Sequence, residues 1–173
     1  AFEYLTTMNR VDSSKVGMSG ICTGASMLAV AAQDPRISSN IKFLNFFAGY
    51  YDATDLVRAV SSRTSFQKDV FRLWEPDKLT ISVLNQHLIE GVTDVHDRSI
   101  LKRMFIENED ISNVQPISLG SEGFATYQLI NGASLSETND LIENLSTSTI
   151  RFLKAISPST NIHLLKTKMF IMH

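Results

Sequence analysis

The segment Gly20–Gly24 (GICTG) constrains the fold of this chain more than any other part of its sequence. It follows a short apolar run, residues 15–20, and precedes a run from Thr23 that is rich in Ala, Leu and Met, which favour helices. A side chain at the centre of such a turn has a strained backbone conformation, which requires small residues on either side. Gly20 and Gly24 meet that requirement, so the segment predicts a strand, a tight turn centred on Cys22, and a helix.

The residues after this helix predict a second strand. Asp34 and Pro35 end the helical pattern, and residues 41–49 (IKFLNFFAG) have the apolar density of a strand buried on both faces. A strand, a helix and a second strand in this order form the βαβ unit of a parallel sheet. Residues 168–173 (KMFIMH) are again typical of a strand. The sequence therefore predicts an α/β fold with parallel strands and flanking helices.

The middle of the chain, residues 56–157, shows helical periodicity instead. Within it, residues 108–132 are polar and contain one proline and three glycines, which predicts loops. Ser134 and Glu137 have the spacing of a capping box at the start of the last helix. The apolar stripes that predict four helices are Val70, Phe71 and Trp74; Val83, Leu84 and Leu88; Ile100, Leu101, Met104 and Phe105; and Leu141, Leu145, Phe152, Leu153 and Ile156.

Composition argues against several classes of function. The chain has 173 residues, enough for one sizeable core. Its 16 Lys and Arg against 18 Asp and Glu leave a net charge of −2, which disfavours a basic surface for nucleic acid. Its apolar runs are shorter than the ~20 residues that span a bilayer, and no secretory signal pattern opens the chain. We therefore expect a cytoplasmic globular protein without a nucleic-acid or membrane partner.

Cys22 is the only cysteine, which excludes an internal disulfide and a multi-cysteine zinc site. At the start of a helix, free backbone N–H groups and the helix dipole favour the thiolate over the thiol. The backbone N–H of Thr23, the next residue, is placed to bind an oxyanion. These features favour a nucleophilic cysteine that needs no metal and no cofactor. The alternative is a small buried hydrophobic side chain, which is the usual role of a free cysteine.

With these elements, residues 1–37 resemble the nucleophile-elbow region of the α/β-hydrolases: a helix, a Val-Asp turn, a strand, the GxCxG elbow, an Ala-rich helix and an Asp-Pro-Arg turn. The central cysteine is similar to that of the dienelactone hydrolases, although Ala25 stands where those enzymes usually carry a glycine. The resemblance implies a partial α/β-hydrolase fold, with residues 1–55 as the core, 56–157 as an inserted, mostly helical cap and 158–173 as the return to a core strand. It also implies that the three expected strands are neighbours in one sheet.

The resemblance places the other members of a catalytic triad outside these residues. In the family the acid usually follows the seventh strand and the histidine the eighth, and the last expected strand here resembles the seventh. The oxyanion loop near the third strand would precede Ala1. Some members place the acid after the sixth strand, which nominates Asp52 or Asp55. The alternative is that Asp52 or Thr54 caps the following helix, the commoner role of such residues.

The four histidines offer no clear base. His87 falls on an apolar helix face and is expected to pack there. His96 lies between two aspartates and suggests a metal ligand, but a single histidine without a second ligand at helical spacing favours a solvated turn. His163 lies in the linker before the last strand, and His173 matches a family position that is not the catalytic base.

These observations favour an enzyme that hydrolyses an ester, a lactone or a related small acyl compound through Cys22. The alternative is a non-catalytic subunit that keeps the fold and has lost the chemistry. In either case the outer strands expose unpaired backbone groups, so we expect the remainder of the hydrolase fold or a partner chain to cover them. Candidates for lining a substrate pocket under the cap are Phe71, Trp74, Met104 and Phe105, whereas Lys102 and Arg103 are expected on a solvated face.

Overall fold

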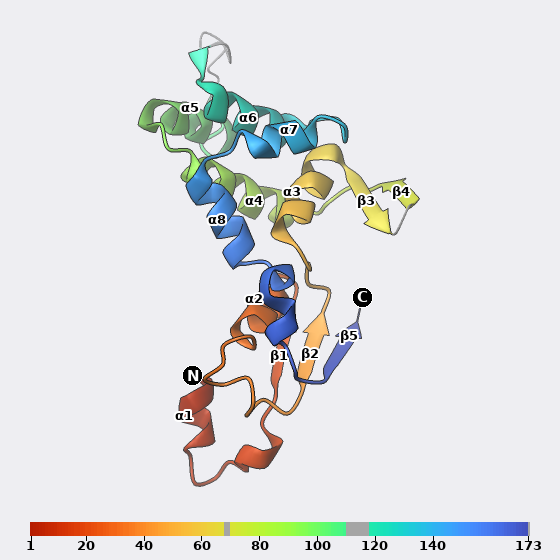
Figure 1. Ribbon diagram of the computed structural model, residues 1–173. Coiled ribbons are helices and arrows are strands. Elements are labelled where there is room, and N and C mark those ends of the chain that lie inside the picture. Colours follow the sequence, from red (N-terminus) through yellow and green to blue (C-terminus); the bar gives the residue numbers. More distant parts are fainter. Residues whose placement is uncertain (68–69, 110–117, 173) are drawn as a thin grey trace. The chain divides into compact units, whose positions relative to one another are not determined.

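The computed structural model describes residues 1–67, 70–109 and 118–172 (Figure 1). The chain forms two compact units, each with its own core. Unit 1 consists of Ala1–Ala53 and Leu153–His173, and unit 2 consists of Thr54–Phe152. None of the helices in the described part of the chain has both the length and the apolar character needed to traverse a lipid bilayer.

Unit 1 contains a parallel sheet of three strands in the order β1-β2-β5. This confirms the predicted parallel α/β arrangement and the predicted pairing of the three strands. Leu44 of β2 lies opposite Met18 of β1 on one side and Met169 of β5 on the other. The elements of unit 1 are α1 (Phe2–Thr6), the 3-10 turn η1 (Ser13–Lys15), β1 (Met18–Ile21), α2 (Thr23–Ala31), β2 (Leu44–Phe47), the 3-10 segment η3 (Pro158–Leu164) and β5 (Met169–Met172).

The first strand begins later than the sequence predicts. Lys15 belongs to η1 rather than to a strand, because Asp12 accepts a hydrogen bond from the Ser14 N–H at 3.0 Å and caps that turn. The second strand is also shorter than residues 41–49. The predicted strand 168–173 is confirmed as β5, except that its last residue, His173, lies outside the described residues.

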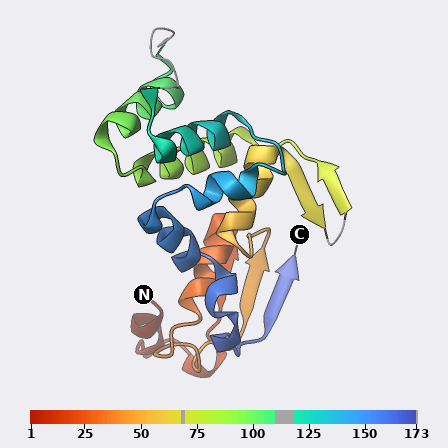
Figure 2. The same cartoon turned by 45° about the horizontal axis from the view of Figure 1, so that its top comes forward.

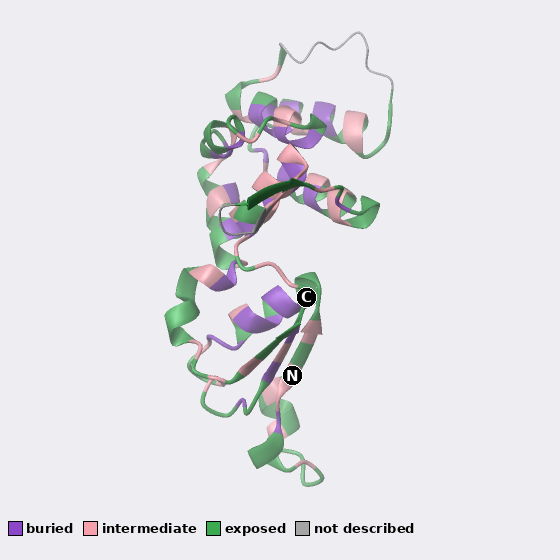
Figure 3. Cartoon of the chain, turned by 90° about the vertical axis from the view of Figure 1, so that its right-hand side faces the viewer, coloured by how far each residue is buried: buried purple, intermediate pink, exposed green. Residues whose placement is uncertain are grey.

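One face of the sheet packs against α2 and forms the core of unit 1. Figure 3 colours the buried residues of the chain purple. Leu44 and Phe46 of β2 pack against the buried side of α2, including Ala25 and Leu28. Because side chains alternate along a strand, the residues between them point to the opposite face. Phe47, on that opposite face, is exposed. The prediction that residues 41–49 form a strand buried on both faces is therefore wrong.

The opposite face, here called the open sheet face, is mostly apolar and exposed, and it also carries Ser19 and Asn45. Its large apolar residues are Ile21, Phe47, Phe170 and Met172, whose relative exposures are 69%, 42%, 59% and 46%. The first, second and fourth of these lie side by side in register across the three strands. Parallel sheets in proteins are normally covered on both faces, so this surface has the character of an interior layer.

Unit 2 is mostly helical, as the periodicity of residues 56–157 predicts. The predicted helices with stripes at Leu84 and Leu101 are confirmed as α4 and α5, and each starts at an aspartate that accepts hydrogen bonds from two backbone N–H groups. These caps are Asp77 and Asp94. The helices of unit 2 are α3 (Ala53–Ser62, of which Ala53 belongs to unit 1), α4 (Lys78–Gly91), α5 (Val95–Phe105), α6 (Ser121–Asn131), α7 (Thr138–Glu143) and α8 (Thr147–Ala155, to Phe152 in this unit).

A β-hairpin replaces the first predicted helix of this block. Strands β3 (Thr64–Gln67) and β4 (Val70–Leu73) pair in antiparallel register, yellow in Figure 2. The Trp74 N–H continues the pairing by donating to the carbonyl of Arg63 at 2.8 Å. The helical stripe of Val70, Phe71 and Trp74 was misleading because β-branched and aromatic residues favour strands, and three positions are too few to distinguish the two periods.

Helix α6 occupies part of the segment that the sequence predicts as loops. Two of the three glycines that suggested loops mark its ends, since Gly120 is its N-cap and Gly132 its C-cap with φ 105°. Gly123 lies inside the helix, where a Cβ would stand 2.3 Å from the Asp97 carboxylate. That carboxylate is buried and accepts a hydrogen bond from the Gly120 N–H at 2.9 Å. Gly123 is therefore required by close packing against Asp97 and does not mark a loop.

The last predicted helix is divided into α7 and α8. The Ser146 Oγ accepts a hydrogen bond from the Thr149 N–H at 3.1 Å and starts a new helix there. Before α7, Glu137 accepts from the Ser134 N–H at 3.1 Å, which is the glutamate half of the predicted capping box. The Ser134 hydroxyl also donates to Glu137 instead of capping the backbone.

One carboxylate joins three segments of unit 2. Glu122, in the first turn of α6, accepts hydrogen bonds from the N–H groups of Thr93, before α5, and of Ser146, before α8, both at 3.0 Å. The Thr93 hydroxyl donates to the same carboxylate. Partial burial acts to raise the pKa of Glu122, but these hydrogen bonds outweigh it and hold the pKa below its usual value.

We expect Glu122→Gln to lower the free energy of unfolding at neutral pH by about 1–2 kcal/mol, since hydrogen bonds to a charged acceptor are lost. Because the carboxylate form is the stabilised one, this contribution is present above the ordinary carboxyl pKa of 4.5 and is lost as the pH falls through the lower pKa of the folded protein. Denaturant unfolding of both proteins at several pH values measures the difference.

The control is Glu143→Gln, which removes an exposed carboxylate of α7 with no partner among the described residues. It is expected to change stability by less than about 0.5 kcal/mol. If Glu122→Gln is as stable as the unchanged protein at neutral pH, the proposed role of this carboxylate is wrong.

Candidate functional site

Cys22 stands between the last residue of β1 and the first residue of α2, in a conformation that side chains rarely adopt. Its φ is 55° and its ψ is −135°, outside the regions normally allowed to residues with a Cβ. Such a conformation costs about 1–3 kcal/mol and persists only where neighbouring groups hold it. The thiol itself is exposed to solvent. The strand, tight turn and helix predicted around Cys22 are all present.

Two backbone hydrogen bonds hold this turn. The Cys22 N–H donates to the carbonyl of Phe47, the last residue of β2, at 2.8 Å. The carbonyl of Cys22 accepts from the Ala25 N–H at 2.9 Å and so begins the first turn of α2. The thiol therefore lies at the carboxyl ends of β1 and β2, the edge at which ligands bind in parallel α/β sheets.

The two glycines of the turn differ in their surroundings. A Cβ on Gly20 would stand 2.7 Å from the carbonyl oxygen of Gly24 and 2.8 Å from the backbone of Ala25. Real Cβ atoms do not approach backbone atoms this closely, so only glycine fits between β1 and α2 at this position. A Cβ on Gly24 would meet no atom within 4 Å. The steric requirement predicted for both positions thus holds among the described residues for Gly20 alone.

A hydrogen bond joins the loop after β2 to α2. The Ser26 hydroxyl, fully buried in α2, donates to the carbonyl of Tyr50 at 2.8 Å. A Cβ on Gly49 would stand 2.9 Å from the same hydroxyl oxygen, so the loop passes close to α2. Burial raises the pKa of the Tyr50 phenol to about 12, and its hydroxyl donates to the carbonyl of Ile156 at 3.3 Å. Neither Ser26 nor Tyr50 belongs to a sequence pattern that predicts this contact.

The polar surroundings of the thiol are sparse. Within the described residues, the Cys22 Sγ has one side-chain hydrogen-bond partner, the Thr23 hydroxyl at 4.0 Å. Thr23 is the first residue of α2, so its backbone N–H has no carbonyl within the helix to bond. This N–H can donate to an oxyanion that forms on a substrate attacked by the thiol.

The two candidate acids have other partners. Asp52 directly precedes α3 and accepts a hydrogen bond from the Ser159 hydroxyl at 2.6 Å within unit 1. Asp55 lies in the first turn of α3 and forms an ion pair with Arg58 within unit 2. Asp52 follows β2, whose last carbonyl binds the Cys22 N–H, so it belongs to the same unit as the thiol.

The histidines lie on different parts of the chain. His163 belongs to η3 in unit 1 and is exposed. His87 is in α4, where its half-exposed ring lies 5.9 Å from that of Phe152, so it is less packed than expected. His96 is exposed in the first turn of α5 rather than in a turn between elements. His173 lies outside the described residues.

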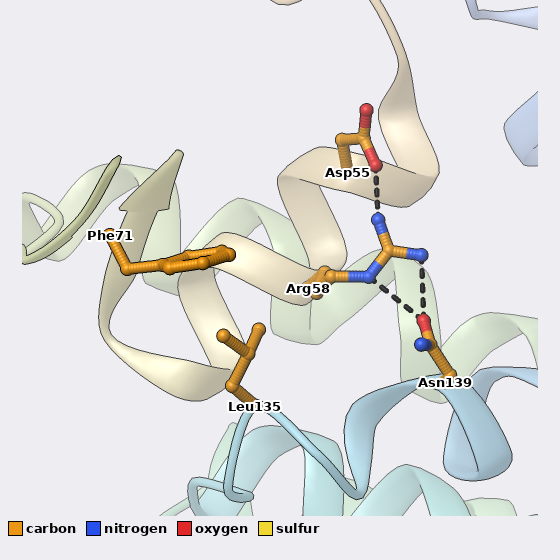
Figure 4. A pocket seen from close by; sticks show the side chains of 5 residues that line it. All are labelled: Asp55, Arg58, Phe71, Leu135 and Asn139. Carbon is orange, nitrogen blue, oxygen red and sulfur yellow. Dashed lines mark hydrogen bonds and ion pairs between the residues drawn. The ribbon is translucent and has the colours of Figure 1, made fainter. Parts of the chain in front are cut away.

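Arg58 of α3 lines a pocket in unit 2, together with Asp55, Phe71, Leu135 and Asn139 (Figure 4). The Arg58 Nε and Nη2 donate to the Asn139 side-chain oxygen at 2.9 and 2.8 Å, and Nη1 pairs with Asp55. The pocket has a volume of about 340 Å³, and the rings and aliphatic groups of Phe71 and Leu135 complete it. Because Asp55 and Asn139 already occupy the guanidinium, this pocket has little capacity for an anion. Of the four pocket candidates from the sequence, it includes Phe71.

Other predicted surface features are present. Lys102 and Arg103 are solvated as expected and form ion pairs with Glu107 at 3.6 Å and Glu109 at 2.6 Å. The described residues contain no group of three or more His, Cys, Asp or Glu side chains that could hold a metal ion. Comparison with known proteins gives no match to a family model, to a curated protein or to a solved structure. The site is therefore interpreted from its own geometry.

Alanine at Gly20 and alanine at Gly24 are expected to have different effects on the free energy of unfolding. Gly20→Ala is expected to lower the free energy of unfolding by about 2 kcal/mol or more, because the methyl group must push backbone atoms apart. Gly24→Ala, its matched control in α2, is expected to be neutral or to stabilise by up to about 1 kcal/mol through helix propensity. Thermal unfolding of both variants tests this, and equal destabilisation would contradict it.

The strain at Cys22 leads to a second expectation. Cys22→Gly should be more stable than Cys22→Ala by about 1 kcal/mol, since glycine adopts this φ and ψ without a clash and alanine does not. The comparison uses alanine because both variants lack the thiol. An alanine variant as stable as the glycine variant would show that the backbone at this position is not strained.

Proposed function

We propose that this chain carries the nucleophile of an acyl hydrolase of the α/β-hydrolase type, similar to the dienelactone hydrolases, and that Cys22 is that nucleophile. The observation that carries the proposal is the conformation of Cys22, with φ 55° and ψ −135° between a parallel strand and a helix. A glycine would relax this strain, so the presence of a side chain there indicates a use for that side chain. The substrate class we propose is an ester, a lactone or a related small acyl compound.

The reaction follows from the groups at the turn. The Cys22 thiolate attacks the acyl carbonyl carbon, and the electron pair of the C=O bond moves to oxygen to give a tetrahedral oxyanion. The Thr23 N–H donates a hydrogen bond to that oxyanion. Collapse of the intermediate expels the alcohol oxygen as an alkoxide, which takes up a proton, and leaves a thioester on Cys22. Water, activated by a base, then hydrolyses the thioester and restores the thiol.

The groups that activate water belong to other parts of the fold in this proposal. Among the described residues the thiol has only the Thr23 hydroxyl as a side-chain hydrogen-bond partner, so in this proposal the acid, the base and the second oxyanion donor come from outside these residues. The open sheet face supports the same view, because its exposed apolar side chains need cover. We propose that further segments of a hydrolase fold, or a partner chain, supply both.

A non-catalytic subunit of the same fold is the second candidate. The same sparse surroundings of the thiol favour it, because no histidine among the described residues hydrogen-bonds to Cys22. In that case Cys22 would keep the strained turn of an ancestral enzyme without its chemistry. The two candidates differ in whether the thiol reacts with an activated ester.

For the 173-residue chain, p-nitrophenyl acetate is expected to release one p-nitrophenolate per molecule and to stop there. The thiolate can attack an activated ester unaided, but without a base the acetyl thioester is not hydrolysed quickly. Absorbance gives the stoichiometry of the release, and mass spectrometry of peptides locates the acetyl group on Cys22.

Cys22→Ala is the control and is expected to show no release above the background hydrolysis. Cys22→Ser is expected to lose the burst as well, since a hydroxyl needs a base that these residues do not provide. Release at the same rate from the alanine variant would remove Cys22 from the mechanism. A thiol that is acylated only after denaturation would favour the non-catalytic subunit.

A further inference from the structure

Unit 2 contains a second pocket, formed by α4, the turn after it, α5 and the start of α8. Its volume is about 500 Å³, within the range of sites for small ligands. Both apolar and polar side chains line it, and they include Val92, Phe152, His87, Ser148 and Arg98. The sequence places His87 and Phe152 on separate predicted helices, and no sequence pattern predicts that they line one pocket.

Arg98 is the feature of this pocket that has no structural explanation. Its side chain is partly buried and has no hydrogen-bond or ion-pair partner among the described residues. The carboxylates nearest in sequence are used elsewhere, since Asp94 caps α5 and Asp97 binds the Gly120 N–H. A partly buried guanidinium with five unused N–H donors favours an oxyanion partner.

Glu90 is the carboxylate that lines this pocket, and it has partners other than Arg98. The Glu90 Oε1 accepts a hydrogen bond from the Gln86 Nε2 at 3.0 Å, and its Oε2 lies 3.9 Å from the His87 Nδ1. Although Glu90 and Arg98 line the same pocket, they do not form an ion pair. The cation of Arg98 is therefore not neutralised by the carboxylate that lines the same pocket.

We propose that this pocket binds a small molecule with an oxyanion group, a carboxylate or a phosphate, joined to an apolar body. The Arg98 guanidinium forms two parallel hydrogen bonds to the oxyanion. The Ser148 hydroxyl and the His87 ring stand at the same pocket as further donors. Phe152 and Val92 provide the apolar surface, the first of them 45% exposed and so accessible to a ligand. This site is independent of the function proposed for Cys22.

The test is a titration of the isotope-labelled 173-residue chain with benzoate and with phenyl phosphate, followed by amide chemical shifts. Both probes carry an aromatic body, so their relative affinities distinguish a carboxylate site from a phosphate site. Shifts are expected at α4, α5 and the start of α8. In Arg98→Gln the affinity for the preferred probe is expected to fall about tenfold or more, because the charged hydrogen bonds are lost. Arg98→Lys, which keeps the charge but not the planar fork, is expected to weaken it less.

The matched control is Arg151→Gln, which removes an exposed arginine of α8 that does not line this pocket. It is expected to bind both probes as the unchanged protein does. Because the Arg98 side chain forms no hydrogen bond or ion pair among the described residues, its substitutions are expected to change thermal unfolding little. Unchanged thermal unfolding of Arg98→Gln then shows that lost binding is not a folding defect. Absence of shifts at millimolar concentrations of both probes, or equal affinity in Arg98→Gln, would overturn the proposal.

Discussion

The backbone conformation of Cys22 is the constraint on which the arrangement of unit 1 depends. A residue with a side chain avoids φ 55° and ψ −135°, so the surrounding chain must hold it there. The hydrogen bond to the Phe47 carbonyl does this, together with the close approach of Gly20 to the backbone of Gly24 and Ala25. The same contacts bring β1 beside β2 and direct α2 onto one face of the sheet. The position of the thiol and the packing of the core therefore have one cause.

In unit 2, buried and partly buried carboxylates hold the helices together. Glu122 joins the segments before α5 and α8 to α6, and the buried Asp97 binds the start of α6. These acids satisfy backbone N–H groups that helix ends leave without partners, so they are committed to the fold. The cation of Arg98 faces a pocket without such a commitment. A charge that the fold does not use is the better indicator of a ligand.

Local signals were sufficient where one element determines its own structure. The Ala-rich run after Thr23 and the apolar stripes at Leu84 and Leu101 identify α2, α4 and α5, because helix propensity and helical periodicity are properties of neighbouring residues. They failed at α6, where Gly123 is needed by the Asp97 side chain of another helix. No pattern within α6 itself could reveal that contact.

The sequence by itself determined the strand, turn and helix around Cys22, because that chemistry lies within five consecutive residues. It also determined that the strands are apolar enough to form a parallel sheet. Only the tertiary structure decided which face of that sheet is covered, that Gly20 rather than Gly24 is sterically required, and that Arg98 faces a pocket. Burial and pairing of charges depend on segments far apart in the chain, whereas propensity depends on neighbours. For this reason Cys22 could be proposed from the sequence as a nucleophile, whereas the pocket lined by Arg98 could not be predicted.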